Sequence, residues 1–269
     1  LWQCSLSTSS LLRNEKGEAA AVSPAKKIRW IGIDYGQCIM TPASLRNPLM
    51  FGDIAKLRGK QEEAARFIQR MRRLKEKYGT ISKIKEGHKD EIESFVLDGD
   101  HEAMLIFGEK EQELLGMAPG LLEFLKWVNE HGIRPSIVSE LKKTLGPVGS
   151  DMITLYLNRK GIIDHFEYFI TPQGKMKLST EEQDLRYKGT SKENGTLYDE
   201  LVKDLGEQGI SPEECLMIGD KWSTDIKPPK QRGWTTIQYT GHIDMGQCEE
   251  ADYYAKDFYE VQDIVAKLI

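Results

Sequence analysis

Short apolar runs alternate with segments of helical period from about residue 117 to the C-terminus, and this alternation most constrains the fold. The runs IRPSIVSE, FEYFIT, ECLMIGD and WTTIQYT are typical of strands, and a similar run, KIRWIGI, lies near the N-terminus. Amphipathic helical patterns separate them. Strands that alternate with helices pair in parallel, because each crossover helix packs back onto the sheet. The sequence therefore predicts an α/β fold with helices on both faces of a parallel sheet.

Residues 41–116 have a different character and predict an all-helical insert. Their helical patterns are DIAKLRGKQEEAARFIQRMRRLKEKY, KDEIESFVL and EAMLIFGEKEQELLG, separated by glycines. We therefore expect a core domain of residues 27–40 and 117–269, interrupted by this insert. Residues 1–26 are an N-terminal tail for which three interpretations stay open: a remnant of a longer chain, a transit-like leader, or a segment packed on the body.

Composition excludes several classes of partner. The net charge is −5, whereas binding to a nucleic acid backbone requires a basic face. The basic run RFIQRMRRLKEKYG has apolar residues at helical spacing, which indicates a solvated face and a core face. No apolar stretch approaches the length of a membrane span. The four cysteines show no metal-ligand spacing, so we expect a reduced, cytoplasmic setting.

Three of the expected strands end on polar residues, Asp34, Ser139 and Asp220. In an open α/β sheet the carboxyl ends of parallel strands line the ligand crevice. The alternative for a single residue is a local role, such as a helix cap for Asp220 or a turn residue for Ser139. Three polar ends on one sheet favour a functional site.

Four motifs, in this order and spacing, resemble the haloacid dehalogenase-like (HAD) superfamily, whose members are mostly phosphatases with a Rossmann-like core. The motifs are IRWIGID, PSIVS, the lysine of SKENGTLYDELVKDLG, and CLMIGDKWSTD. The resemblance implies a Rossmann-like, doubly wound sheet. It also implies that residues 41–116, which fall between motifs one and two, form a helical cap domain that selects the substrate. An insert that serves only as an oligomer contact is the alternative.

The resemblance also implies roles for individual residues. Asp34 is the expected nucleophile, because a carboxylate that attacks phosphorus splits one hard displacement into two easier ones. Ser139 would donate a hydrogen bond to a phosphoryl oxygen. Lys192 would neutralise the nucleophile and the transferring group, with the nearby Lys188 as the alternative lysine.

A magnesium ion is the cofactor that the resemblance implies. Mg²⁺ prefers oxygen ligands and is often held by one or two carboxylates with water and phosphate. Asp34, Asp220 and the backbone carbonyl of Gly36 are the expected ligands. Asp225 would bind the ion directly or hold its waters.

Gly36 marks a departure from the family pattern. The family's phosphatases usually carry a second aspartate two residues after the nucleophile, as a general acid/base, and its loss typically costs about 10²–10⁴-fold. One interpretation is a substrate whose leaving group needs little acid, such as an acyl phosphate or an activated phosphonate. Alternatively, the insert supplies the acid, the reaction is another one of the family, or the protein is not catalytic. The candidate acids of the insert are His88, Lys85, Arg46 and His101.

The sequence therefore predicts a Mg²⁺-dependent hydrolase that acts on a phosphorylated or phosphonate small molecule through an aspartyl-phosphate intermediate. One alternative is a catalytically impaired relative that binds a phosphorylated ligand or a protein partner. The other is a dehalogenase-type hydrolase, which attacks carbon and needs no metal ion. The sequence predicts neither the substrate nor the oligomeric state.

Overall fold

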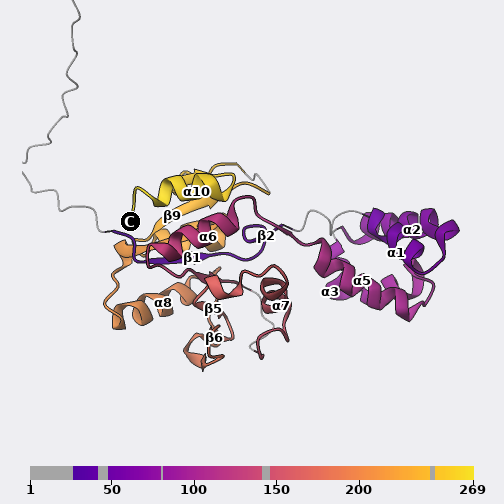
Figure 1. The fold of residues 1–269 in the computed structure, drawn as a ribbon, viewed down its shortest axis with the longest axis horizontal. Helices are drawn as coiled ribbons and strands as arrows, with labels where there is room; N and C mark the ends of the chain where they lie inside the picture. Colours follow the sequence, from indigo (N-terminus) through magenta and orange to yellow (C-terminus); the bar gives the residue numbers. More distant parts are fainter. Residues whose placement is uncertain (1–26, 42–47, 80, 141–145, 243–245) are drawn as a thin grey trace, which may run out of the picture.

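The protein, seen in a computed structural model, consists of a larger α/β unit joined to a smaller helical unit (Figure 1). The structure describes residues 27–41, 48–79, 81–140, 146–242 and 246–269. The expected N-terminal tail, residues 1–26, lies outside the described residues.

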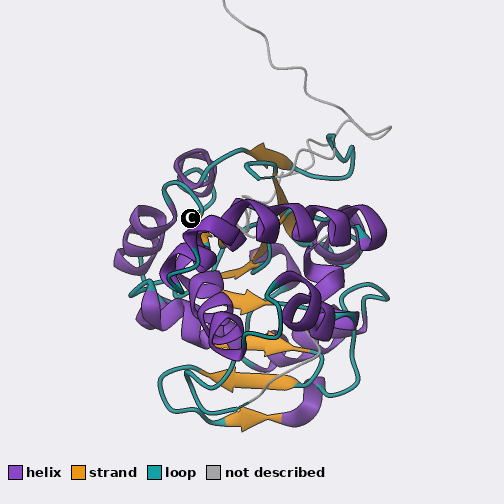
Figure 2. Ribbon diagram, turned by 90° about the vertical axis from the view of Figure 1, so that its right-hand side faces the viewer, coloured by secondary structure: helices purple, strands orange, loops and turns teal. Residues whose placement is uncertain are grey.

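The α/β unit is built on one eight-stranded sheet in the described part of the chain, with the order β10-β9-β8-β1-β4-β5-β6-β7. Figure 2 shows its strands lying one above another. Six strands pair in parallel: β1 (Trp30–Ile33), β4 (Ser136–Val138), β5 (Tyr168–Thr171), β8 (Cys215–Gly219), β9 (Thr235–Tyr239) and β10 (Tyr253–Ala255). The predicted α/β fold is confirmed by this parallel region.

At one edge the sheet departs from the predicted parallel pairing. There β6 (Gly174–Lys177) and β7 (Gln183–Asp184) run antiparallel to their neighbours. Thr171 pairs with Gly174, so only two residues join β5 to β6. Such a tight hairpin permits only antiparallel pairing, because a parallel partner needs a long crossover.

Helices cover both faces of the sheet, as the sequence predicts. They are α6 (Leu121–Glu130), α7 (Met152–Arg159), α8 (Thr196–Glu207), α9 (Lys227–Lys230) and α10 (Phe258–Val265), with short turns at Ile163–His165, Leu185–Tyr187 and Pro212–Glu214. Along β1, Ile31 and Ile33 belong to the core under α6 and α10, whereas Trp30 belongs to the core under α8. This alternation follows the two-residue period of a strand.

The helical unit has a hydrophobic core of its own. It comprises α1 (Leu49–Leu57), a turn at Gln61–Glu63, α2 (Ala64–Tyr78), α3 (Ile81–Gly87), α4 (Lys89–Glu91), a π-helical turn at Ile92–Val96, and α5 (His101–Leu114). Phe51 and Phe107 pack in this core with ring centroids 5.1 Å apart. The first predicted helical pattern is interrupted at Gly59, whose φ of +70° ends α1 and lets the chain turn into α2.

A two-stranded ribbon joins the two units. Its strands are β2 (Met40–Thr41) and β3 (Gly116–Met117), which pair antiparallel. A Cβ at Gly116 would lie 2.2 Å from Thr41 Oγ1, so glycine allows the two strands to approach. None of the helices in the described part of the chain has the length and hydropathy that a membrane span requires.

Candidate active site

Three carboxylates meet at the carboxyl ends of the central strands. Asp34 follows β1, and Asp220 follows β8, which pairs with β1. One oxygen from each of Asp34, Asp220 and Asp225 lies within 4.8 Å of the others. Adjacent parallel strands therefore bring together two aspartates that are far apart in the sequence.

The π-helical turn η7 (Trp222–Ile226) positions Asp225. Asp225 Oδ2 accepts a hydrogen bond of 3.0 Å from the Lys221 amide, which closes the turn on itself. A Cβ at Gly219 would lie only 2.4 Å from the Asp225 side chain, so the last residue of β8 must be small. The local sequence GDKWSTD thus folds so that its second aspartate points back at the strand end.

Lys192 lies between two of these carboxylates. Its side chain is 1% exposed, and Nζ lies 2.6 Å from Asp34 Oδ1 and 2.5 Å from Asp225 Oδ1. It also donates a hydrogen bond of 2.9 Å to the Val138 carbonyl at the end of β4. The other candidate lysine, Lys188, is exposed. The structure therefore brings Lys192 to the carboxylates.

Ser139 lies at the end of the neighbouring strand β4, and Gly36 lies in the loop after β1. Ser139 follows β4, is 3% exposed, and its amide donates a hydrogen bond of 2.9 Å to the Ile170 carbonyl. Gly36 lies two residues beyond Asp34. A Cβ built at Gly36 would meet only Asp34 Oδ2, at 3.9 Å, so the position has room for a larger side chain. The carbonyl of Gly36 remains a predicted metal ligand.

Burial and crowding of like charges shift the pKa values of the site. Burial raises the pKa of Asp34 to about 7; Lys192 lowers it, and the neighbouring carboxylates raise it. Burial and the charge of Asp225 raise the pKa of Asp220 to about 6. Burial opposes the charge of Lys192, but Asp225 and Asp34 outweigh it and raise the pKa of the lysine.

This donor set fits a hard divalent cation. The site contains three carboxylates and the single ammonium group of Lys192, so the buried side chains carry an excess of negative charge. Asp225 Oδ1 is buried and accepts no hydrogen bond of normal geometry, although Lys192 Nζ is near. Carboxylate oxygens in this arrangement are the ligands that Mg²⁺ takes in proteins.

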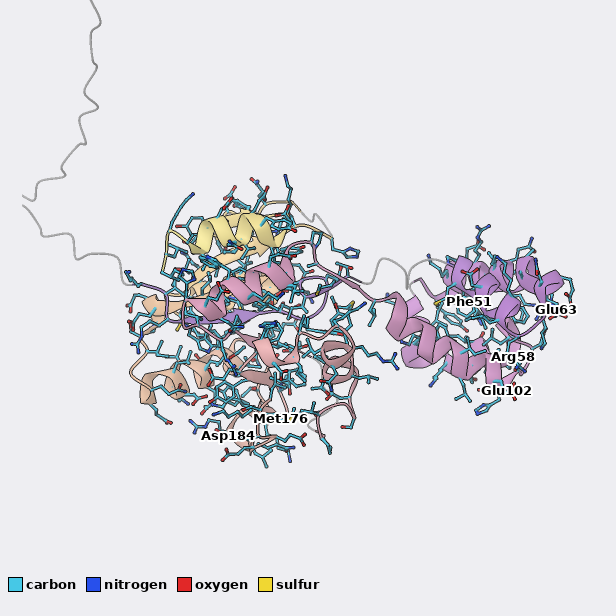
Figure 3. The ribbon with its side chains drawn as sticks, in the orientation of Figure 1. Phe51, Arg58, Glu63, Glu102, Met176 and Asp184 are labelled. Atoms are coloured by element: carbon cyan, nitrogen blue, oxygen red, sulfur yellow. The ribbon has the colours of Figure 1, made fainter. Side chains whose placement is uncertain are left out.

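Three of the four candidate replacement acids lie in the described part of the helical unit. His88 follows α3, stacks on Tyr78 with ring centroids 3.7 Å apart, and its Nδ1 lies 3.4 Å from Glu91. His101 begins α5 and is 74% exposed. Figure 3 places its neighbour Glu102 at the end of the helical unit away from the α/β unit, whereas Figure 1 shows α3 at the nearer end. Lys85 lies on α3, and Arg46 lies outside the described residues.

Glu140 is a residue of the site that the sequence reasoning missed. Its carboxylate accepts hydrogen bonds from Ser191 Oγ at 2.8 Å and from the Lys192 amide at 2.6 Å. The only available signal was its position directly after Ser139, because its partners lie about fifty residues further along the chain.

A family model matches the C-terminal part of the described chain. The family model HAD-hydrolase-like matches residues 189–262, a segment that contains Lys192, Asp220 and Asp225. This segment of the chain is therefore similar to HAD-like hydrolases.

Solved HAD structures share the fold. The HAD-hydrolase YfnB of Bacillus subtilis, solved with bound magnesium, superposes with a TM-score of 0.53 and 14% identity over 89% of this chain and 99% of that one. A haloacid dehalogenase-like hydrolase of Xanthomonas campestris gives a TM-score of 0.53 and 13% identity over 90% and 96%. At these identities the likeness shows the fold alone.

Two curated relatives match parts of the chain. A protein named as a pyrophosphatase, PpaX of Clostridium perfringens, is 26% identical over 148 residues, which is 54% of this chain. A glyceraldehyde 3-phosphate phosphatase of Methanocaldococcus jannaschii is 35% identical over 66 residues, 24% of this chain. These matches span 58% and 29% of the relatives' own lengths.

Proposed function

We propose that the protein is a Mg²⁺-dependent hydrolase that acts on a phosphorylated or phosphonate small molecule through an aspartyl-phosphate intermediate at Asp34. The contact of 2.6 Å between Lys192 Nζ and Asp34 Oδ1, at the edge where three carboxylates meet, carries this proposal. The pyrophosphatase and phosphatase names of the relatives support a small phosphorylated substrate.

The proposed reaction has two displacements at phosphorus. A carboxylate oxygen of Asp34 attacks and forms an O–P bond, while the leaving group departs with the electrons of its own bond to phosphorus. Water then attacks the acyl phosphate, releasing phosphate and restoring the carboxylate. Lys192 stabilises the negative charge of the transferring group, and the Ser139 hydroxyl donates a hydrogen bond to one of its oxygens.

Asp34, Asp220 and Asp225 would hold the metal ion, with the Gly36 carbonyl as a further ligand. When bound, Mg²⁺ supplies positive charge that allows a carboxylate and a phosphoryl group to approach each other. The raised pKa values of Asp34 and Asp220 support such a site, because burial and the neighbouring carboxylates disfavour the charged forms, which a bound cation would stabilise.

Gly36 favours substrates with a leaving group that needs little protonation, such as an acyl phosphate or an activated phosphonate. The buried neighbours Tyr35 and Cys38 are poor replacements for an aspartate, because burial raises the pKa of both far above neutral. The position itself has room for a side chain. The same glycine supports the second candidate function, a catalytically impaired relative that binds a phosphorylated ligand or a protein partner. A dehalogenase-type reaction is less well supported, because attack on carbon does not need three carboxylates.

We further propose that residues 41–116 act as a cap domain over the site. The ribbon of β2 and β3 joins the helical unit to the loop that follows Asp34. The YfnB structure is described as revealing interdomain movement. A comparable movement in this protein would bring the helical unit over the carboxylates and exclude water from the reacting phosphorus.

Trapping a phosphoryl mimic tests this function. The protein is incubated with Mg²⁺ and beryllium fluoride, and fluorine NMR records signals from the adduct on Asp34. We expect bound signals in the native protein and none in Asp34→Asn or without Mg²⁺. The same samples are assayed with acetyl phosphate and para-nitrophenyl phosphate. An absence of both adduct and turnover across a broad panel of phosphoryl donors would contradict the enzyme proposal.

Gly36→Asp separates the two candidate functions. In a site that is complete except for its acid, the added carboxyl should raise turnover of para-nitrophenyl phosphate more than turnover of acetyl phosphate, by up to about 10²-fold. Gly36→Asn is the matched control, because it has the same size without the acid. A variant that stays inert while the native protein still binds phosphorylated ligands favours the binding role.

A further inference from the structure

Glu140 connects two loops that come from distant parts of the chain. It follows Ser139 at the end of β4, and its two carboxylate oxygens accept from Ser191 Oγ at 2.8 Å and from the Lys192 amide at 2.6 Å. Each oxygen has its own donor, so the contact fixes both the distance and the orientation between the loops. Glu140 itself is half-buried.

Glu140 binds the turn of residues 191–195, which contains Lys192. Two hydrogen bonds also stabilise the backbone of this turn. The Ser191 amide donates one of 2.9 Å to Thr196 Oγ1, and the Gly195 amide donates one of 3.1 Å to the Lys192 carbonyl. These contacts are internal to the turn. In the described part of the chain, the carboxylate of Glu140 fixes the backbone of this turn to the strand end beside Ser139.

The ammonium end of Lys192 has contacts of a different kind. Its three partners include Asp34, which forms and breaks a bond to phosphorus in the proposed reaction, and Asp225, a proposed metal ligand. Once Asp34 carries a phosphoryl group, negative charge moves from its carboxylate to the phosphoryl oxygens, so the contact between Asp34 and the ammonium changes. The contacts with the Val138 carbonyl and, through the Lys192 backbone, with Glu140 involve no reacting atom.

We infer that Glu140 is a positioning residue that keeps Lys192 at a fixed position relative to Ser139 while the charge on Asp34 changes. The inference rests on the proposed function. Preorganised charge stabilises a transition state because no reorganisation is needed when the charge develops. Loss of the contact should therefore slow the chemical step more than it weakens substrate binding.

Kinetics with a matched control test this role. Glu140→Ala should lower kcat for acetyl phosphate by about 10- to 100-fold, the scale of a misplaced electrostatic group, while KM changes by less than about threefold. Glu140→Gln keeps one acceptor oxygen and should fall between Glu140→Ala and the native protein. Glu193→Ala is the control, because it removes an exposed glutamate next to Lys192 and should leave kcat unchanged.

Hydrogen exchange gives a readout that does not need activity. The Lys192 amide donates to Glu140, so a peptide that spans residues 190–193 should lose exchange protection in Glu140→Ala and keep it in Glu193→Ala. The inference is overturned if protection is unchanged in Glu140→Ala, or if its kcat falls no further than that of Glu193→Ala. If the native protein turns over no donor, the proposed function fails, and the exchange comparison alone decides whether Glu140 holds the turn.

Discussion

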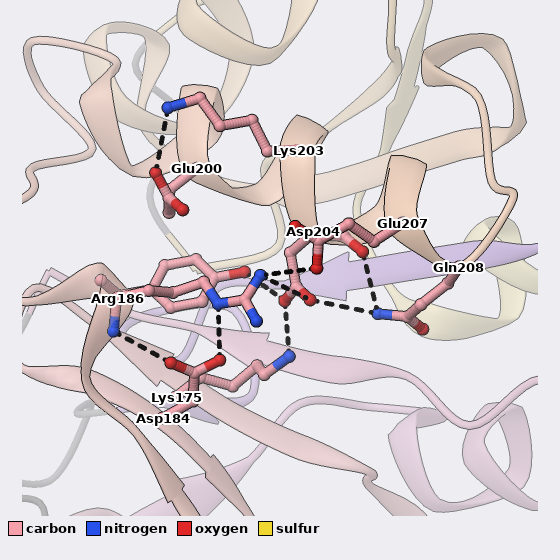
Figure 4. Close-up of polar contacts among 9 residues, drawn as sticks. Lys175, Asp184, Arg186, Glu200, Lys203, Asp204, Glu207 and Gln208 are labelled. Carbon is pink, nitrogen blue, oxygen red and sulfur yellow. Dashed lines mark hydrogen bonds and ion pairs between the residues drawn. The ribbon is translucent and has the colours of Figure 1, made fainter.

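Two buried clusters of acidic and basic side chains in the α/β unit differ in their balance of charge. Asp204 of α8 accepts from Lys175 Nζ at 2.5 Å and from the Tyr187 hydroxyl at 2.6 Å, with Arg186 3.6 Å away (Figure 4). Although burial opposes ionisation, these donors lower the pKa of Asp204. At the site, by contrast, the pKa values of Asp34 and Asp220 are raised.

The difference distinguishes a cluster with balanced charge from the proposed functional site. The Asp204 cluster satisfies its carboxylate with two cations and a hydroxyl, so it needs nothing further. The site leaves three carboxylates with one ammonium, an arrangement that is costly unless a cation joins it. A shortage of positive charge therefore identifies the site more reliably than the mere presence of buried charges.

The largest expected effect comes from replacing the aspartate of each cluster. Asp34→Asn should lower turnover of acetyl phosphate by about 10³-fold or more, because it removes the proposed nucleophile. Asp204→Asn should leave turnover within about threefold and lower the free energy of unfolding by about 3 kcal/mol, because Lys175 loses its charged partner. Initial rates and urea unfolding measure both. Equal losses of turnover in the two variants would contradict the proposal that only the Asp34 cluster takes part in the reaction.

Replacing the lysine of each cluster should have the next largest effect. In EDTA near neutral pH, Lys192→Met should lower the free energy of unfolding by about 3–5 kcal/mol, because it leaves Asp34 and Asp225 buried without a cation. Lys175→Met should cost about 1–3 kcal/mol, because Tyr187 and Arg186 still contact Asp204. Urea unfolding curves check the order, and a larger loss for Lys175→Met would contradict it.

The pH dependence of stability should have opposite signs in the two clusters. The folded state raises the pKa of Asp34 from 3.8 to about 7 and that of Asp220 to about 6, so it binds their protons more tightly than the unfolded chain does. Their contribution is full below pH 3.8 and is lost as the pH rises toward 7. The lowered pKa of Asp204 gives a contribution that is present above 3.8 and lost as the pH falls below it.

Urea unfolding in EDTA over a series of pH values checks these signs. Asp34→Asn should flatten the fall in stability between about pH 4 and pH 7, and Asp204→Asn should flatten the loss at acid pH. A native protein whose stability rises steadily from pH 4 to pH 7, with no change of slope in Asp34→Asn, would contradict the assignment of excess negative charge to the site.

The sequence predicts the parallel region of the sheet and the strand-end residues because both depend on local patterns. Apolar runs that end on Asp34, Ser139 and Asp220 show where strands stop, and neighbouring strands then bring these ends together. The edge strands β6 and β7 were not predicted, because their short, polar sequences lack the apolar alternation of a strand.

Contacts between distant residues explain what the sequence did not reveal. Glu140 and Lys192 are 52 positions apart, and Lys175 and Asp204 are 29 apart. A glutamate or lysine alone carries no pattern that names its partner, since both are ordinarily surface residues. The spacing of the family motifs suggested Lys192, whereas no comparable pattern suggested Glu140 or Asp204.

Calorimetric titration with Mg²⁺ tests the central claim, that the three carboxylates of the site bind a divalent cation, most directly. At a pH between the raised values of about 6 for Asp220 and about 7 for Asp34, binding of Mg²⁺ should release protons, measured as a heat that depends on the buffer. We predict that Asp220→Asn weakens or abolishes this binding and that Asp204→Asn leaves it unchanged. No binding of Mg²⁺ to the native protein, or equal binding and equal proton release in Asp220→Asn, would contradict the account.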